Sequence, residues 1–525
     1  MGSMIAGWSC WLLLSAGPGG MFASIGGGAQ PAECVQSRRP TSEATEHNPL
    51  ITSEELERHV RVLASDAFEG RETGTRGGRR AAGYLAGILK KTGVEPAGDD
   101  GGFLQDVGLV KLVRESLPAL AARGSGAVEQ PLWGADYDLR PDLPLADTGW
   151  LRVVRVTSAE EMPAKVEPGV ALFLDGSRRR REEWLAAVPA GERLDGEAGP
   201  ATPGDVEHEA DRKGTNWGLL LYPGSRRPGR VRSLGKAGLR PAPGDENPWL
   251  VPRGTLLEGL RSGAISELRL KSGLTLVPAG AANVVGILPG VGTAERPDLA
   301  RETVVLSAHY DHLGLVGEGG HGGEQSSQDG EPDLVYNGAD DDASGTAAVL
   351  ELAGALAAAD PPVRTVVFLL ATGEEKGLLG TKYYLDHPAV PLADTIFNLN
   401  FEMIGRPDEL AEGVGGLWLT GHGRTTMWAE AQEAGVELFA DQRPNEHFFE
   451  RSDNYAFVMR GILGQTLSSY NMHSDYHRVS DEADLLDYEH MELGVRRGLG
   501  LVRLLLSGEL TPRWVPGGEP QRRRR

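Results

Sequence analysis

The chain has 525 residues, which is room for two or three domains, and its 40% hydrophobic and 24% charged residues are typical of a folded globular protein. A formal net charge of −21 argues against a nucleic-acid partner. Both cysteines, Cys10 and Cys34, lie near the start of the chain. Thiolate metal ligands and a disulfide framework are therefore excluded from the rest of it.

The N-terminal segment is expected to direct export. Residues 5–14 form a short apolar run, which Gly17-Pro18-Gly19-Gly20 ends well before the roughly 20 apolar residues that a membrane span needs. We interpret 1–48 as a signal peptide followed by a polar linker, and expect a periplasmic or extracellular protein with no stable membrane span. The alternative is a disordered apolar tail or a mis-assigned start, because the usual positive charges before the apolar run are missing.

Two amphipathic helices are expected after the linker. The first begins at Ser53, its expected cap, and carries Leu56, Val60 and Leu63 at helical spacing. A glycine-rich loop, 70–78, precedes the second helix, from about 79 to 91. We assign 49–105 to the N-terminal helical part of a catalytic domain.

The composition and pattern of the sequence change between residues 106 and 278. Prolines and charges increase, and short strand-like runs appear at 151–156, 170–174 and 219–221. This pattern predicts an inserted β-rich domain with long loops. A polysaccharide- or surface-binding role for this region is an alternative function of a different class.

Strands and helices alternate from residue 279 to residue 510, and 511–525 is expected to be a disordered tail. The alternation predicts an α/β fold with a mostly parallel, mixed central sheet and helices on both of its faces. Sheets of this kind carry their active sites at the carboxyl ends of the strands. The expected strands are 283–288, 303–307, 364–371, 395–403 and 461–465, and the expected helices are 342–359, 375–387, 425–434 and 488–506.

Histidines and carboxylates gather where these strands end. His309 and Asp311 follow one expected strand, and the triplet 340–342 opens a helix. Glu374 and Glu375 follow the next strand, Glu402 ends another, and 473–477 (HSDYH) lies late in the chain. Histidine and carboxylate ligands without sulfur suit a pair of divalent metal ions that share a bridging carboxylate. A further carboxylate that binds no metal would then serve as the general base.

Five segments carry a resemblance to a known family: HYDHLG, NGADDDASG, GEEKGLLG, NFEMIGR and YHRVSD. Together they resemble the co-catalytic zinc aminopeptidases, a family that includes bacterial leucyl aminopeptidase and, more distantly, glutamate carboxypeptidase. The matching core covers roughly 281–506. LASDAFEGRETGT resembles the segment that precedes this core in larger bacterial members, in which a protease-associated domain occupies the position of our β-rich region.

The resemblance implies two zinc ions per chain and a role for each site residue. Asp341 would bridge the two ions, and His309 and His477 would each bind one. Glu375 would be a further ligand of the ion bound by His477. Glu402 would be a further ligand of the ion bound by His309, although leucyl aminopeptidase has an aspartate at the position of Glu402. Glu374 would be the general base, and Asp311 would orient His309.

Some residues keep alternative roles. His312 and His473 are alternative ligands. The spacing alone does not decide which of Glu374 and Glu375 binds metal and which is the general base. Asp340 and Asp342 are expected to cap or shape the loop rather than to bind metal. Asp453 and Tyr455, in a segment that resembles the family's substrate pocket, are expected to contact substrate.

The function that this set predicts is a zinc-dependent exopeptidase, an aminopeptidase that acts on peptides outside the cytoplasm. The alternatives are a carboxypeptidase of the same fold, a glutaminyl cyclase with a single zinc ion, and a non-catalytic receptor-like relative. The sequence does not indicate the side-chain preference, the physiological metal or the oligomeric state.

Overall fold

The computed structural model describes most of the chain beyond the expected signal peptide and linker, which lie outside the described residues. The last five residues, 521–525, also lie outside them. The described residues are 51–520 apart from 115–118, 126–130, 132–136, 141–147, 162–169, 178–179, 181–218, 222–237, 242–248, 272 and 318–332.

A mixed sheet organises the part of the chain that carries the candidate site. Among the described residues it has nine strands, in the order β1-β13-β17-β14-β18-β21-β19-β20, with β2 paired to β13. The four strands β17, β14, β18 and β21 run parallel, whereas β13 and β19 run antiparallel to their neighbours β17 and β21. The strands are β1 (Glu95–Pro96), β2 (Leu104–Asp106), β13 (Ala282–Leu288), β14 (Thr303–His309), β17 (Thr365–Ala371), β18 (Thr395–Phe401), β19 (Trp418–Leu419), β20 (Phe439–Ala440) and β21 (Leu463–Ser468).

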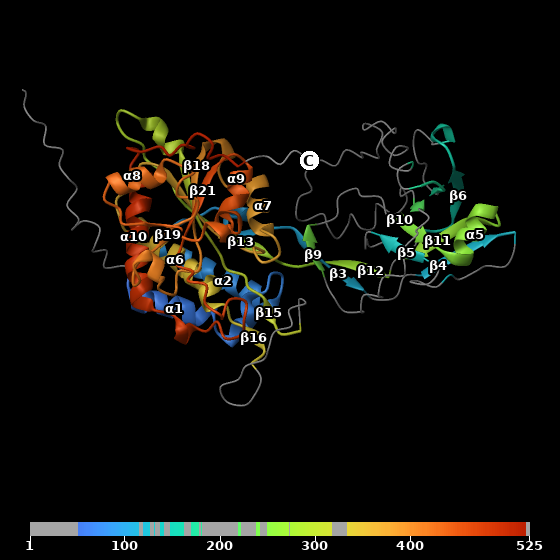
Figure 1. Ribbon diagram of the computed structural model, residues 1–525, viewed down its shortest axis with the longest axis horizontal. Helices are drawn as coiled ribbons and strands as arrows, with labels where there is room; N and C mark the ends of the chain where they lie inside the picture. Colours follow the sequence, from blue (N-terminus) through green and yellow to red (C-terminus); the bar gives the residue numbers. More distant parts are fainter. Residues whose placement is uncertain are drawn as a thin grey trace, which may run out of the picture. The chain divides into compact units, whose positions relative to one another are not determined.

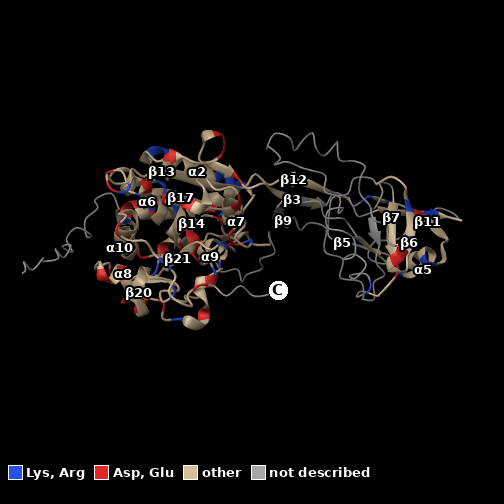
Figure 2. Cartoon of the chain, turned by 90° about the horizontal axis from the view of Figure 1, so that it is seen from above, with Lys and Arg blue, Asp and Glu red and all other residues tan. Residues whose placement is uncertain are grey.

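The parallel strands are buried on both faces, and the sequences of β14 and β17 are largely apolar in both registers. Val304 and Leu306 of β14 pack into one core with helices α1, α2, α6 and α10, while Val305 packs into a second core with α7 and α9. These strands carry no charged side chain, and the charged residues lie on the surrounding helices and loops (Figure 2). The helices, which Figure 1 labels, are α1 (Ser53–Leu63), α2 (Arg76–Thr92), α6 (Gly345–Ala357), α7 (Leu379–Asp386), α8 (Met427–Glu433), α9 (Asn454–Met459) and α10 (Tyr488–Leu506).

The predicted α/β architecture with helices on both faces is therefore confirmed, and α10 has the predicted bounds. Two local predictions were wrong. Thr52, not Ser53, caps α1, because its extended backbone lets its hydroxyl accept the N–H of Glu55 at 3.2 Å. Glu375 does not begin a helix: the glycines at 373 and 377 take φ values of 73° and 97°, which form a turn, and α7 starts only at Leu379.

The region between β2 and β13 forms further sheets. A seven-stranded sheet has the order β4-β11-β6-β7-β8-β10-β5, and a three-stranded one has the order β12-β3-β9. The larger sheet has its own core, in which Phe173 and Leu268 pack with Leu256 of helix α5 (Gly254–Ser262). The expected strands 151–156, 170–174 and 219–221 are all present. The strands are β3 (Leu109–Arg114), β4 (Ala119–Gly124), β5 (Tyr137–Arg140), β6 (Leu151–Val156), β7 (Val170–Leu174), β8 (Leu219–Leu221), β9 (Gly238–Pro241), β10 (Trp249–Pro252), β11 (Ile265–Lys271) and β12 (Leu274–Pro278). The division into an inserted domain at 106–278 stays a prediction.

The chain leaves and re-enters the nine-stranded sheet at neighbouring positions. Asp106 of β2 pairs with Ala282 of β13, and the antiparallel pairing continues through β3 and β12, where Val110 faces Pro278. The paired strands β3 and β12 thus begin and end the intervening segment. Among the described helices, none has both the length and the apolar character needed to cross a membrane.

Candidate metal centre

The parallel strands bring the predicted site residues to one edge of the sheet. His309 is the last residue of β14, and Glu402 directly follows β18. Glu374 and Glu375 lie in the turn after β17, and His477 lies in the loop after β21. Because parallel strands all end at the same edge, residues far apart in the sequence become neighbours there.

The aspartate triplet lies in the segment Ala339–Ser344, immediately before α6, in which Asp341 and Asp342 have non-helical backbone angles. Its outer members shape the loop, as predicted. Asp342 accepts backbone N–H groups from Gly345 and Met403, both at 3.0 Å, and Asp340 accepts that of Gly405 at 2.7 Å. The peptide bond between Asp341 and Asp342 is cis.

The two carboxylate oxygens of Asp341 face two different histidines. Its Oδ1 lies 3.3 Å from Nε2 of His309, and its Oδ2 lies 3.2 Å from Nε2 of His477. Two ligands that each sit about 2.0–2.1 Å from one tetrahedral zinc ion are about 3.3 Å apart. Both distances therefore match pairs of ligands that share a metal, with Asp341 between the two positions.

Glu375 extends the group around His477. Its Oε2 lies 3.4 Å from Nε2 of His477, again the separation of two ligands on one ion. The structure also brings in His312, whose Nδ1 lies 2.9 Å from Oε1 of Glu375 and 3.9 Å from Oδ2 of Asp341. His312, Asp341 and Glu375 thus form a compact group with metal-ligand spacing.

Several buried atoms of this site lack hydrogen-bond partners among the described residues. They include Nε2 of His309, both ring nitrogens of His312 and Oε1 of Glu375, some of which nevertheless lie close to an oppositely charged neighbour. Buried polar atoms are normally hydrogen-bonded. Ligands of one cation point their nitrogen and oxygen atoms at the ion and do not hydrogen-bond to one another. The unpaired atoms of this site show that arrangement, so the residues fit a metal ion.

Glu374 is anchored through its backbone. Its N–H donates to Oδ1 of Asp311 at 3.1 Å, and Oδ2 of Asp311 accepts the hydroxyl of Thr73 at 2.7 Å. The nearer contact of the His309 ring is with the backbone carbonyl of Asp311, at 3.1 Å from Nδ1, while the Asp311 carboxylate is 3.9 Å away. Asp311 therefore holds the Glu374 turn with its side chain and faces His309 mainly with its backbone.

Glu402 lies on the same side of the site as Glu374. Its Oε2 accepts hydrogen bonds from Ser452 and, at 3.2 Å, from Nδ2 of Asn400. Both Glu402 and Glu374 line a pocket together with Asp341 and His477. Glu402 is thus placed to reach an ion from the pocket wall.

Burial and neighbouring charges shift the pKa values of these carboxylates in opposite directions. Burial, reinforced by Asp341, Asp453 and Glu375 and opposed by His309, raises the pKa of Glu402 to about 8. Burial likewise raises the pKa of Glu374 well above its usual value. Burial alone would also raise the pKa of Asp341, but hydrogen bonds to the two histidines hold it well below the usual range. Without a cation beside them, Glu402 and Glu374 thus favour their protonated forms, and a bound cation would favour their carboxylates.

Aromatic side chains form the rest of the pocket wall. Trp418 stacks on Phe448 at 5.2 Å between ring centroids, and Tyr476 stacks on His477 at 3.9 Å. Arg451 contacts the rings of Phe448 and Tyr476. The remaining lining residues are Met403, Thr420, Ser452, Thr466, Ser468 and Tyr470.

Three sequence-predicted residues lie apart from this group. Asp453 is buried and accepts the hydroxyl of Thr381 at 2.6 Å, and Tyr455 packs edge-on against Phe449; neither is among the pocket-lining residues. Nε2 of His473 lies 3.0 Å from Oδ2 of Asp340, so this ring faces the loop-shaping aspartate. Of the two alternative ligands, only His312 lies beside the proposed ones.

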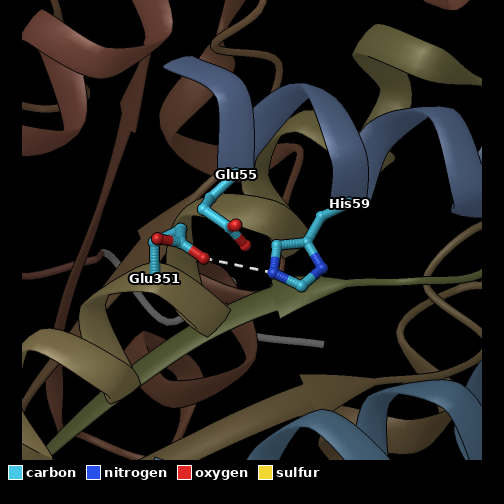
Figure 3. A group of neighbouring side chains, drawn as sticks. All are labelled: Glu55, His59 and Glu351. Carbon is cyan, nitrogen blue, oxygen red and sulfur yellow. Dashed lines mark hydrogen bonds and ion pairs between the residues drawn. The ribbon is translucent and has the colours of Figure 1, made fainter. Parts of the chain in front are cut away.

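A second group of histidine and glutamates lies at the packing of α1 against α6 (Figure 3). Nε2 of His59 is 3.1 Å from Oε1 of Glu351, and its Nδ1 is 2.7 Å from the Tyr84 hydroxyl of α2. Glu55 accepts hydrogen bonds from Arg58. Because protein groups already satisfy this histidine and these carboxylates, the cluster is a polar link between three helices, in contrast to the unpaired atoms of the centre.

Comparison with known proteins finds a family whose model matches the segment that holds these residues. The model of Peptidase family M28 matches residues 283–494. A vacuolar membrane protease of Lachancea thermotolerans is 28% identical over 151 residues, which are 27% of this chain and 15% of that protein. Leupeptin-inactivating enzyme 1 of Streptomyces exfoliatus is 44% identical over 80 residues, or 14% and 18% of the two chains. The chain thus spans less than a fifth of the length of either relative.

Solved structures of aminopeptidases, among them the zinc aminopeptidase BSAP, also resemble the chain. That of BSAP from Bacillus subtilis has 17% sequence identity and a TM-score of 0.42, covering 89% of this chain and 98% of its own. An aminopeptidase from Aneurinibacillus sp. strain AM-1 has 16% identity and a TM-score of 0.41, with coverages of 87% and 94%. The segment that matches Peptidase family M28, residues 283–494, carries every proposed metal ligand.

Proposed function

We propose that the chain is a zinc-dependent aminopeptidase with two zinc ions. The observation that carries the proposal is the position of Asp341, which lies 3.3 Å from His309 through one oxygen and 3.2 Å from His477 through the other. A carboxylate held between two histidines in this way suits a bridge between two ions. The match of residues 283–494 to Peptidase family M28 supports peptide-bond hydrolysis as the reaction.

The chain offers ligands for both ions. His477, Glu375 and Oδ2 of Asp341 would hold one, and His309, Oδ1 of Asp341 and Glu402 the other; His312 is close enough to Glu375 to replace or support it. When bound, such ions polarise the scissile carbonyl and lower the pKa of water. Glu402 in place of aspartate has one more methylene, and Ser452 and Asn400 fix its carboxylate.

Glu374 would move the proton. Its carboxylate lines the pocket and is not among the groups in contact with the histidines, so it can remove a proton from the attacking water and return it to the leaving amine as the peptide bond breaks. Burial in the metal-free site favours its protonated form; two nearby cations would oppose this and favour the carboxylate that a base requires. Asp311 holds this turn in place through the N–H of Glu374.

The rival functions make different demands on these residues. A non-catalytic relative would not need a general base, and a cyclase with one zinc ion would not need the bridge. A carboxypeptidase could use the same centre. The free amine of an aminopeptidase substrate is a cation, and it suits a pocket whose wall includes Asp341, Glu374, Glu375 and Glu402.

The test compares wild type with Glu374→Gln for zinc content and for hydrolysis of leucyl anilide, its N-acetylated form and an N-blocked dipeptide. Glu433→Gln, at an exposed position of α8, is the matched control. We expect two zinc ions per chain in wild type and in both variants. Wild type and Glu433→Gln should cleave only the free-amine substrate, and Glu374→Gln should not cleave it. Cleavage of only the N-blocked dipeptide would establish the carboxypeptidase, and no cleavage by a zinc-loaded wild type would favour the receptor-like relative.

We further propose that the protein is exported and that 106–278 forms an inserted domain of the protease-associated type. The first rests on the apolar run at 5–14, and the second on the separate core around Phe173 and Leu268.

A further inference from the structure

Arg71 lies outside the family-matched segment, and it is completely buried. Its guanidinium donates to four backbone carbonyls: that of Tyr310 from Nε at 2.7 Å, those of Leu63 and Asn337 from Nη1 at 2.7 and 2.6 Å, and that of Gly338 from Nη2 at 2.8 Å. A planar group with five donors can satisfy such a set, whereas a lysine ammonium cannot reach it. The side chain therefore acts as a clamp on carbonyls from three separate segments.

Two of these segments carry proposed metal ligands. Tyr310 directly follows His309, and Gly338 lies three residues before Asp341. The backbone at Gly338 has a φ of 55°, and a Cβ there would lie 2.3 Å from the carbonyl oxygen of Asp341, so this turn is tightly confined. Arg71 thus links the loop of one histidine ligand to the loop of the proposed bridging aspartate.

Thr73 makes a second connection. Its buried hydroxyl donates to Oδ2 of Asp311 at 2.7 Å, and Oδ1 of the same carboxylate accepts the N–H of Glu374 at 3.1 Å. The hydrogen bonds run in series from Thr73 through Asp311 to the turn of the proposed general base. The hydroxyl therefore orients a carboxylate that in turn fixes this turn.

Glu72 makes a third connection. Its Oε1 lies 3.1 Å from Nζ of Lys376, the residue after Glu375. Its Cβ would be 2.7 Å from a Cβ placed on Gly314, so a side chain at position 314 would displace it. Three consecutive residues thus reach the loops after β14 and β17 and the loop before α6.

The backbone around this segment adopts an unfavourable conformation to direct these side chains. Glu69, Gly70 and Arg71 have φ values of 50°, 61° and 50°, in the left-handed region. For a residue other than glycine this region is sterically unfavourable. Such strain persists where the surrounding contacts hold it, and it is often found at functional sites.

We propose that Arg71-Glu72-Thr73 is a positioning element that sets the geometry of the metal centre from outside the family-matched segment. The proposal rests on the proposed function, since it takes His309, Asp341 and Glu375 as ligands. None of the three residues would touch metal or substrate. Their effect would be to keep three ligand loops at the mutual distances that two ions require.

The decisive variant is Thr73→Val, which removes one hydroxyl and keeps the shape of the side chain. Thr73→Ser keeps the donor, and Thr92→Val, at the distant end of α2, is the matched control. Zinc affinity is measured by competition with a chromophoric chelator, and kcat and KM with leucyl anilide. Removing a group that orients metal ligands typically costs about 10–100-fold in affinity or activity. We expect Thr73→Val to lose about tenfold in zinc affinity and in kcat at an unchanged KM, and Thr73→Ser and Thr92→Val to retain both.

Wild-type zinc affinity and kcat in Thr73→Val would overturn the proposal, as would an equal loss in Thr92→Val. Arg71→Lys, which keeps the charge but not the clamp, should lose more than Thr73→Val; if it does not fold, the threonine series still decides. The affinity measurement needs no substrate. If wild type binds zinc but cleaves no peptide, the proposed function fails while the positioning role is still tested.

Discussion

The buried carboxylate of Asp481 accepts the backbone N–H of Asp341, with 3.1 Å between the nitrogen and Oδ2. It also accepts the N–H of Asp340 and pairs with Arg406 at 3.3 Å. The carboxylate thus holds the peptide groups on either side of Asp340, directly before the proposed bridging side chain. An ionised carboxylate accepts hydrogen bonds at both of its oxygens, whereas an amide accepts at one oxygen and donates from its NH₂ group.

We therefore expect Asp481→Asn to weaken zinc binding. The amide keeps one accepting oxygen but turns an NH₂ group toward a backbone N–H or toward Arg406. By analogy with other groups that orient metal ligands, zinc affinity should fall about 10–100-fold. Asp484→Asn is the control, because Asp484 is 80% exposed and pairs only with Arg61 in the described structure. Equal zinc affinities of the two variants in a chelator titration would contradict the role of Asp481.

The two late histidines should respond differently to removal. His477→Ala takes away a side chain beside both Asp341 and Glu375, so it should lose zinc and at least about a hundredfold in kcat. His473→Ala leaves these contacts intact and removes a partner of Asp340, so it should keep its zinc and unfold at a lower temperature. Metal analysis of the two purified variants, together with their melting curves, distinguishes them. Loss of zinc from His473→Ala alone would reverse the assignment.

His490 should make the fold sensitive to mild acid. It is buried, its Nδ1 accepts the N–H of Gly415 at 2.7 Å, and its Nε2 lies 2.9 Å from the hydroxyl of Ser469. Burial lowers the pKa of His490 from its ordinary 6.5 to about 4. Between these values the unfolded chain binds the proton more readily than the folded one, so the stabilisation is complete above pH 6.5 and is lost as the pH falls toward 4.

The expected loss from this one group is about 2 kcal/mol between pH 7 and pH 5. His490→Asn can keep an acceptor for Gly415 but does not titrate in this range. Urea unfolding at both pH values should show a smaller pH-dependent decrease in the variant, by about that amount. An equal decrease in both proteins would mean that His490 is not responsible.

Much of the metal centre could be predicted because its ligands follow a rule of topology. His309 and Glu402 stand where two apolar strands end, and parallel strands end together, so proximity follows from the alternation of strands and helices. His312 is different. It lies three residues after His309 in a loop without periodicity, and only the path of that loop brings its ring beside Glu375.

Arg71 shows what a pattern of residue types cannot reveal. In the sequence it is one arginine in a glycine-rich loop, and such residues are mostly exposed to solvent. Its burial depends on carbonyls more than 230 residues away in the sequence, such as those of Tyr310 and Asn337, which become available only once the sheet has formed. The same holds for the turn after β17, where two glycines overrode the expected helix at Glu375.

The paired ends of the segment between β2 and β13 bear on how this chain could change in length. Asp106 and Ala282 are ladder partners, and so are Val110 and Pro278. The catalytic sheet therefore meets the 167 residues between Val110 and Pro278 as the two arms of one hairpin. The loop that joins the arms of a hairpin can be lengthened or shortened at small entropic cost, since each doubling costs only about 0.6 kcal/mol. Insertion, loss or exchange of whole modules at this point would leave the strand register beneath the metal centre unchanged.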